Sequence, residues 1–532
     1  MRELAGTATL VRLALRRDRV LLPVWILVFV SLAAGSAKAS IDLYPDLQSR
    51  VNAANTTNSS PALVSLYGRI FDSTSLGELS LFKLTSFGAL LVALLAAMVV
   101  VRHTRTEEES GRLELLSAGV LGRYASLTAA LIVSAGTVIV MGLLTAVSLM
   151  GTGLPAPGSF AFGLTWAAAG LAFAGVGAVT AQLSEGARTA NGLTAVVLGV
   201  SYVLRALGDS ASADGPHWIS WLSPIGWAQQ IRPYAGDRWF VVLLPLALTG
   251  VLVAAAFALV RRRDVGAGLV RPRPGPATAA PSLRSPLALA WRLQRGSLYG
   301  WAVAFLLLGF IVGNIASNVD GFVSSASAKE MVEKLGGVTG ITDGFLSAEM
   351  GMLGLLASAF GIQAALRLRS EETALRAEPL LATGVTRSRW LASHVIIALF
   401  GTALLVVIGG LGSGISSGAS LGNMGRQVPR MLAAAAVQLP AIWLVTALVV
   451  VLFGAAPKVV TAAWALFGAF LLIGQFGPIF NLPQGLMDLS PYGHTPRLPG
   501  GDFSATPVIA LTAIAAALLA AGFTTFRRRD IG

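Results

Sequence analysis

The amino-acid sequence predicts an all-α polytopic membrane protein with twelve transmembrane helices, arranged as two tandem parallel repeats of six. Composition and an internal duplication carry this prediction. Of the 532 residues, 55% are hydrophobic and 12% are charged, which leaves too little polar surface to cover a soluble globule of this size. The sequence Arg-Arg-Arg-Asp at 261–264 returns at 527–530, in each case directly after an apolar stretch.

Other local patterns recur at a similar separation of about 265 residues, as a tandem duplication requires. Leu-Ser-Pro at 222–224 returns at 489–491. Arg-Thr-Glu-Glu at 105–108 returns as Arg-Ser-Glu-Glu at 369–372. The separation is larger for markers near the N-terminus, so we expect the second repeat to be shorter by about twelve residues in its first outer loop.

The domain boundaries follow from these markers. We assign the first repeat to 1–264 and the second to 287–532, joined by the Pro- and Arg-rich segment 265–286, which has no apolar period and is interpreted as a linker. Each repeat contains six apolar stretches long enough to cross about 30 Å of hydrocarbon as helix. They are 20–37, 84–101, 124–149, 159–182, 190–206 and 239–260, and then 298–315, 350–366, 390–411, 431–453, 459–480 and 507–525.

Charge predicts the orientation of these spans. Placing both termini in the cytoplasm puts most of the 39 Lys and Arg residues on the cytoplasmic side, in clusters such as 102–123, 261–295 and 367–389. Six spans per repeat give both repeats the same orientation, so they are related by an axis along the membrane normal. The net charge of +13 is therefore interpreted as membrane topology and not as a nucleic-acid surface.

The N-terminal segment has basic residues followed by an apolar stretch, as a secretory signal has. Its counterpart at 298–315 is internal and cannot be removed, so we interpret the segment as a retained first helix. Before the first span of each repeat, basic and apolar residues mix at helical spacing, which predicts a helix lying in the cytoplasmic headgroup layer. The basic residues of these two predicted surface helices are Arg12, Arg16, Arg17 and Arg19, and Arg292 and Arg295.

The loop between the second and third spans, 103–123, carries an unusual acidic run. Helical spacing places Leu113, Leu116 and Val120 on one narrow apolar stripe, with Glu107, Glu108, Arg112 and Glu114 on its flanks. An acidic run is unexpected beside an anionic membrane surface, where basic residues are attracted. Its recurrence at 367–389 favours contact with a partner protein over a merely solvated helix.

This loop resembles the Glu-rich, Gly-x-Leu-Glu-x-Leu-Leu-like motif of ABC-2 type permeases, a class of ATP-binding-cassette transporters. In the first repeat the motif falls on Glu107, Glu108, Gly111, Arg112, Leu113, Glu114 and Leu116. In the second repeat it falls on Glu371, Glu372, Arg376, Glu378, Leu380 and Leu381, with Leu375 where the motif has Gly. The resemblance implies that these residues form coupling helices, and the departure at Leu375 implies that the two are not equivalent.

The same resemblance implies the function. Coupling helices of this family dock on separate ATPase subunits, so two ATPase copies per chain and ATP with Mg on those partners are implied. The duplicated layout resembles that of actinobacterial exporters of polyketide antibiotics, including tetronasin-type permeases, in the bacterial plasma membrane. It implies ATP-driven export of a hydrophobic or amphipathic small molecule by alternating access. Short helices in the outer segment 207–238 are also implied.

The chain carries no phosphate loop of the form Gly-x-x-x-x-Gly-Lys-Ser/Thr, so we expect it to be a transport subunit without an ATPase site or bound cofactor. The four histidines show no i, i+4 pairing, which gives no support to a metal site, and no catalytic residue is assigned. Polar residues within spans are costly and mark candidate substrate contacts. Those candidates are Gln182, Gln363, Gln438 and Gln475.

One alternative stays open at this point. An ion-coupled secondary drug transporter of the major facilitator type also has twelve spans in two parallel halves. Against it, the loop between spans two and three is acidic with a Leu-Glu-Leu-Leu core, and the first outer loop is long.

Overall fold

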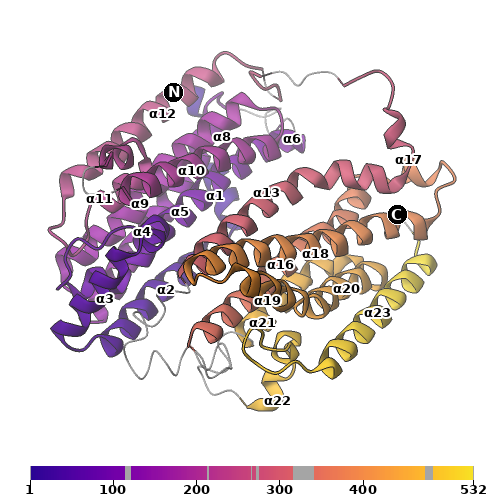
Figure 1. Cartoon of the computed structure of the whole chain (residues 1–532). Coiled ribbons are helices and arrows are strands. Elements are labelled where there is room, and N and C mark those ends of the chain that lie inside the picture. The colour runs from indigo at the N-terminus through magenta and orange to yellow at the C-terminus, as the bar shows by residue number, and fades with distance from the viewer. Residues whose placement is uncertain are drawn as a thin grey trace. The chain divides into compact units, whose positions relative to one another are not determined.

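The computed structural model describes residues 2–113, 121–211, 215–264, 266–270, 275–315, 341–473 and 483–530, and every regular element within these ranges is a helix (Figure 1). The chain divides into two compact units, Met1–Gly275 and Pro276–Gly532. We call them unit 1 and unit 2 and describe each by itself.

Unit 1 contains a long apolar helix for each of the six spans predicted in the first repeat. Their 18-residue windows are apolar enough to cross a membrane. They are α2 (Leu21–Leu43), α5 (Leu76–His103) continued by α6 (Arg105–Glu109), α8 (Ala125–Gly151), α9 (Ala156–Leu183), α10 (Ala187–Asp209), and η3 (Trp239–Val242) leading into α12 (Leu243–Val260).

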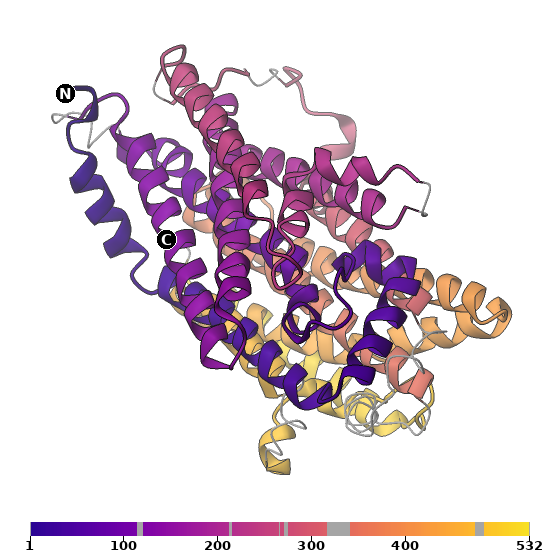
Figure 2. The same cartoon turned by 90° about the vertical axis from the view of Figure 1, so that its left-hand side faces the viewer.

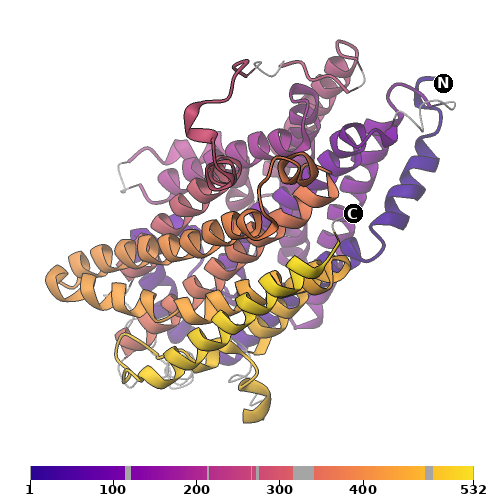
Figure 3. The same ribbon diagram turned by 90° about the vertical axis from the view of Figure 1, so that its right-hand side faces the viewer.

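Unit 2 contains five further helices of this kind, which makes eleven within the described ranges. They are α13 (Pro286–Ile315), α16 (Ile341–Thr373), α18 (Arg387–Ser420), α19 (Met424–Ala436) continued by α20 (Leu439–Ala455), and α23 (Ala505–Arg528). Figure 3 shows α23, in yellow, running beside the orange helices of this unit, where it packs on α20.

The predicted span 459–480 is the one without such a helix. It begins as η6 (Pro457–Ala462) and α21 (Ala463–Leu471), which together form a shorter apolar helix, and residues 474–482 lie outside the described ranges. The twelve-span layout and the side on which the termini lie therefore stay predictions. The shortening predicted for the first outer loop of the second repeat also falls on residues outside the described ranges, 316–340.

The N-terminal helix α1 (Thr7–Arg17) is separate from the first span, as predicted (Figure 2). The chain turns at Asp18, whose side chain is fully buried. Its carboxylate forms an ion pair with Arg102, whose Nη2 lies 2.8 Å away, and lies 2.7 Å from His103 Nε2, both at the end of the second span. A buried carboxylate needs such partners, so tertiary contacts fix the break between α1 and α2.

The corresponding segment of the second repeat is not a separate helix, and its place at the membrane surface stays a prediction. Arg292 and Arg295 lie within α13, which runs without a break from Pro286 to Ile315. In that helix Gln294 contacts His394 Nδ1 through its side-chain amide at 3.1 Å, and the helix continues past it. A helix of 30 residues is about 45 Å long and exceeds the hydrocarbon thickness, so its first turns extend beyond the hydrocarbon as part of the span itself.

Small residues let the spans approach closely. A Cβ at Gly163 of α9 would lie 2.2 Å from the carbonyl oxygen of Gly142 of α8, so neither position has room for a side chain. In unit 2, a Cβ at Gly309 would lie 2.3 Å from the carbonyl oxygen of Gly409. Within membranes, such small-residue contacts replace the hydrophobic effect as a cause of helix association.

The remaining elements are short. In unit 1 they are η1 (Arg2–Leu4), α3 (Leu47–Ser59), α4 (Pro61–Tyr67), η2 (His217–Leu222) and α11 (Pro224–Gln230), and in unit 2 they are η4 (Pro281–Leu283), α17 (Ala377–Leu381), α22 (Gln484–Met487) and η8 (Pro491–His494). The repeated Leu-Ser-Pro sequence is a helix start. Ser223 is the N-cap of α11 and its hydroxyl accepts from the backbone N–H of Gly226, while the following Pro occupies the first helical position.

Candidate functional site

The duplicated acidic and basic motifs meet at one end of each unit. We call the end of unit 1 that carries 102–113 and 261–264 its Arg-rich end. There the Glu108 carboxylate accepts from Arg263 at 2.6 and 2.8 Å, a bidentate pair, and forms an ion pair with Arg105, whose Nη1 lies 2.9 Å away. Bidentate guanidinium pairs are strong and fix geometry as well as energy. All three side chains are at most 7% exposed, so water screens the pairs weakly.

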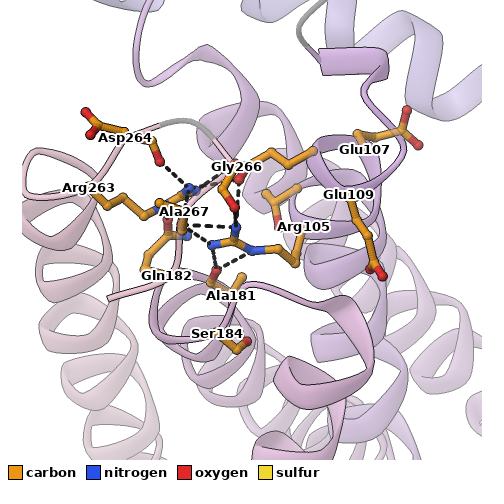
Figure 4. A network of polar contacts seen from close by, with 12 residues as sticks. Arg105, Glu107, Glu109, Ala181, Gln182, Ser184, Arg263, Asp264, Gly266 and Ala267 are labelled. Atoms are coloured by element: carbon orange, nitrogen blue, oxygen red, sulfur yellow. Dashed lines mark hydrogen bonds and ion pairs between the residues drawn. The ribbon is translucent and has the colours of Figure 1, made fainter. Parts of the chain in front are cut away.

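Arg105 is the centre of this network (Figure 4). Its Nε and Nη2 donate to the carbonyl oxygen of Ala181 at 2.9 and 2.5 Å, and its Nη1 donates to those of Gly266 and Ala267 at 3.4 and 3.2 Å. Ala181 lies in the last turn of α9, where helix carbonyls lack intrahelical partners. Arg105 therefore joins the start of α6 to the end of the fourth span and to the segment after the sixth.

Gln182 belongs to the same network. Its Oε1 accepts from Arg263 Nε at 2.7 Å, and its amide nitrogen donates to the carbonyl oxygen of Ala178 at 3.0 Å. The sequence suggested Gln182, the last residue of the predicted span 159–182, as a candidate substrate contact. The structure places it one residue before the end of α9 and gives its oxygen a partner within the protein.

Arg123 connects the third span to the sixth. Its Nη2 donates to the carbonyl oxygens of Val260 and Arg261 at 3.1 and 2.9 Å, at the C-terminal end of α12. A guanidinium there caps orphan carbonyls and complements the negative end of the helix dipole. We call Arg105, Glu108, Arg123 and Arg263 the first tether.

Unit 2 repeats this arrangement with the corresponding residues. Glu372 accepts from Arg369 Nη1 at 3.2 Å and also pairs with Arg529. Arg387 Nη1 donates to the carbonyl oxygen of Arg529 at 2.6 Å, and Arg529 Nη1 donates to that of Phe453 at 2.9 Å, near the end of α20. We call Arg369, Glu372, Arg387 and Arg529 the second tether.

The surroundings of the second tether differ from those of the first. Arg369 is 31% exposed, whereas Arg105 is fully buried. Arg529 takes the central position, with its guanidinium 4.8 and 5.3 Å from the ring centres of Phe453 and Phe526. Burial, with the neighbouring charges of Arg369 and Arg387, lowers the pKa of Arg529, while Glu372 opposes that shift. Cation–π contact and ion pairing together keep this buried cation in place.

Both loops turn in the same way directly after the tethered glutamate. Gly111 has φ +70° and Leu375 has φ +57°, and their N–H groups donate to the carbonyl oxygens of Glu108 and Glu372 at 3.0 and 2.9 Å. This left-handed conformation explains why the motif has Gly here. At Leu375 the same turn is made by a residue with a Cβ, which costs about 1–2 kcal/mol.

The predicted coupling residues divide into a buried and an exposed group. Besides Glu108 and Glu372, Glu371 is buried and pairs with Arg367 at 2.6 Å and Arg376 at 3.0 Å. Glu107 pairs with Arg17 of α1. These carboxylates already form ion pairs with arginines of the chain, so they are not positioned to bind a partner protein.

The exposed group lies after the turn in each loop. It consists of Arg112 in unit 1 and Leu375, Arg376 and Glu378 in unit 2. Leu380 and Leu381 pack against the buried cluster of unit 2. Leu113 is half-buried, and Glu114 and Leu116 lie outside the described residues.

The other sequence candidates lie apart from the tethers. Gln363 is exposed, and its Oε1 accepts from Trp301 Nε1 at 3.0 Å. Gln438 is 3% exposed at the junction of α19 and α20, and its Oε1 has no donor among the described residues. Gln475 lies outside the described residues. Within the described ranges, no group of three His, Cys, Asp or Glu side chains could hold a metal ion.

The long apolar helices define the class of the protein as a multi-pass membrane protein. The family model described as "Multidrug efflux system permease Rv1217c, C-terminal domain" matches residues 8–261 and 283–527. The chain belongs to this permease family. It is also 44% identical over 528 residues to the multidrug efflux system permease protein Rv1217c of Mycobacterium tuberculosis (strain ATCC 25618 / H37Rv), covering 99% of this chain and 95% of that protein.

These findings establish a multi-pass protein of the bacterial plasma membrane. The structure also shows a feature that the sequence did not predict: within each unit, the repeated acidic motif pairs with the repeated Arg-Arg-Arg-Asp motif. A signal was present, because an acidic and a basic motif recur together at nearly the same separation. When an acidic motif and a basic motif are repeated together, contact between the two motifs in each repeat is expected.

Proposed function

We propose that the chain is the membrane-spanning subunit of an ATP-driven exporter of hydrophobic or amphipathic small molecules, powered by a separate ATPase dimer. The Arg-rich ends are cytoplasmic in this proposal, and each loop between the second and third spans receives one ATPase subunit. The family of multidrug efflux permeases supports the efflux role. The resemblance of the loops to ABC-2 coupling helices supports the ATPase partner.

The tethers are the observation that carries the proposal. The first tether connects the end of the second span, the start of the third, the end of the fourth and the end of the sixth. Because the pairs are buried and bidentate, a force on the loop moves these four spans as one body. This is the property that a coupling element requires, and alternating access can use it as rigid-body rocking.

The docking surface is the exposed group beyond each turn, since the carboxylates before the turn are already paired. In unit 2 this surface combines an apolar residue, Leu375 at 63% exposed, with the charges of Arg376 and Glu378. Exposed apolar residues rimmed by charge are typical of protein interfaces. The tethered glutamates then act as positioning residues behind the surface.

The proposal is tested by co-purifying the chain with a candidate ATPase subunit from the same organism and measuring drug-stimulated ATP hydrolysis. We expect charge reversal at both Glu114 and Glu378 to abolish stimulation and co-purification. Asp502→Lys is the matched control, because Asp502 is an exposed carboxylate remote in sequence from both loops. Stimulation that survives the double reversal would reject the docking assignment.

A second measurement separates this mechanism from ion-coupled transport. Export from cells that is lost on ATP depletion and retained in the presence of a protonophore supports the ATPase partner. Export abolished by a protonophore but indifferent to ATP depletion would instead make the chain a secondary transporter.

A further inference from the structure

A polar cavity lies at the end of unit 1 opposite the Arg-rich end. Its volume is about 210 Å³, and its lining comes from the segment before α5, the end of α10, η2 and the segment after α11. Three arginines line it, Arg69, Arg232 and Arg238. The aromatic side chains of Phe71 and Trp221 supply apolar walls.

The positive charge of this cavity is only partly balanced from within. Among the residues that the structure describes, no carboxylate oxygen lies within the 4.0 Å ion-pair distance of the three guanidinium groups. The one lining carboxylate, Asp209, is 6% exposed and lies 3.6 Å from Arg205 Nη1 on its own helix. Asp209 therefore interacts with both Arg205 and, at longer range, Arg69, and the three lining arginines outnumber the one lining carboxylate.

Two of these arginines are close enough to oppose each other's charge. Burial and the charge of Arg238 lower the pKa of Arg232, and Glu78 partly offsets this. The Arg232 guanidinium stacks 3.8 Å from the ring centre of Phe71, and its Nε has no acceptor among the described residues. An anion bound between the two guanidinium groups would relieve the repulsion and supply the absent acceptor.

The segment that presents Arg232 and Arg238 has an unfavourable backbone conformation and is held by side-chain contacts. Arg232, Tyr234 and Asp237 have φ values of +53°, +63° and +35°, a conformation that costs about 1–3 kcal/mol at a non-glycine residue. Tyr234 anchors the segment, because its hydroxyl lies 2.8 Å from Ser159 Oγ and its ring occupies the space left by Gly77 and Gly158. The arginines are thus pre-organised before any ligand arrives.

We infer that this cavity binds the oxyanion of an amphipathic molecule, a carboxylate or phosphate, through Arg69, Arg232 and Arg238, with Trp221 beside the apolar part of the ligand. Guanidinium groups match both oxyanions in geometry. The cavity is smaller than the roughly 300–1,000 Å³ of a site for a whole drug-sized ligand, so it takes the acidic group while the rest of the molecule extends away. The role of this cavity as an exit site for acidic cargo rests on the proposed export function.

The test uses the purified full-length chain in phosphatidylcholine nanodiscs, without an ATPase. Dodecanoate and dodecanol, which differ in the acidic group alone, are titrated below their aggregation concentrations while tryptophan fluorescence is recorded. We expect saturable binding of dodecanoate and at least tenfold weaker binding of dodecanol. The dodecanoate signal should be lost in Trp221→Phe, which identifies the cavity as its origin.

Arg69→Gln, Arg232→Gln and Arg238→Gln should each weaken dodecanoate binding about tenfold, which corresponds to about 1.4 kcal/mol. Arg497→Gln in unit 2 removes the same charge from an exposed position and should leave binding unchanged. Because Arg69 is on a different segment from the strained one, its variant tests the site even if the others fail to fold. Equal binding of the two probes, or unchanged affinity in Arg69→Gln, would overturn the inference.

The source of the oxyanion is decided by adding about one-fifth phosphatidylglycerol to the nanodiscs. Loss of dodecanoate binding on this addition means that a lipid headgroup phosphate occupies the cavity. Undiminished binding means that the cavity is reserved for acidic cargo. Since neither arm needs ATP, failure of this inference is distinguishable from failure of the proposed function.

Discussion

The first and second tethers use the same ionic contacts in different surroundings. In both, a glutamate forms ion pairs with an arginine three residues before it and with the third arginine of the repeated Arg-Arg-Arg-Asp. In the first tether, buried Arg105 donates to three backbone carbonyls. In the second, Arg369 is partly exposed and Arg529 stacks on two phenylalanines. After duplication, the charges stayed fixed while the packing around them diverged.

The arginine with the most contacts is therefore Arg105 in the first tether and Arg529 in the second, and these two residues do not correspond in the repeats. A fully buried guanidinium needs several hydrogen-bond acceptors, and removing it leaves those acceptors without their donor. An arginine at the rim gives little stability of its own. The two repeats should therefore respond differently to equivalent substitutions.

The largest difference is expected for Arg105→Ala against Arg369→Ala. Arg105→Ala leaves Glu108 short of one partner and removes the side-chain donors of the Ala181 and Gly266 carbonyls, which should cost about 3–5 kcal/mol. Arg369→Ala should cost less than about 1 kcal/mol. Thermal unfolding of the purified chain in detergent measures both, and equal shifts would mean that the two tethers have the same centre.

Removing the shared carboxylate should affect both repeats. Glu108→Ala and Glu372→Ala each leave two arginines unpaired, and we expect a cost of about 3 kcal/mol in each case. Adding Arg263→Met to Glu108→Ala should recover part of that loss, with a coupling energy of about 1–3 kcal/mol. A strictly additive double variant would show that Glu108 and Arg263 do not stabilise each other.

The break between α1 and α2 offers a smaller contrast. Asp18→Ala removes the buried carboxylate that holds Arg102 and His103, and we expect it to cost about 2 kcal/mol. Gln294→Ala in the unbroken α13 should cost about half as much, because it removes a neutral contact with His394. Unfolding midpoints compare the two, and a larger effect of Gln294→Ala would contradict a structural role for Asp18.

The smallest effect is expected at the turn. Leu375→Gly should stabilise the chain by about 1 kcal/mol, since Gly adopts a positive φ without strain and the leucine is largely exposed. Gly111→Leu should destabilise it by a similar amount. Leu375→Ala is the control, because it keeps the Cβ and should gain nothing. Stabilisation by Ala as large as that by Gly would assign the effect to the side chain and not to φ.

Sequence reasoning predicted the helices more fully than the site. Eleven of the twelve predicted spans correspond to long apolar helices, since span length depends on local composition and the bilayer sets that length. It also marked Glu108, Glu372 and Gln182 as important. It did not predict that Glu108 and Glu372 face inward, or that Gln182 contacts Arg263.

The sequence by itself determined the membrane class, the duplication and the residue types of both tethers, because these depend on composition and on patterns within a few turns of helix. The tertiary structure alone decided which carboxylates remain exposed and which cations gather in one cavity. It also decided that the chain breaks between α1 and the first span, whereas α13 continues without a break. Glu108 and Arg263 are 155 residues apart in the chain, and no local pattern specifies that two such charges meet. Their pairing results from helix packing, which buries both and leaves each as the other's ionic partner.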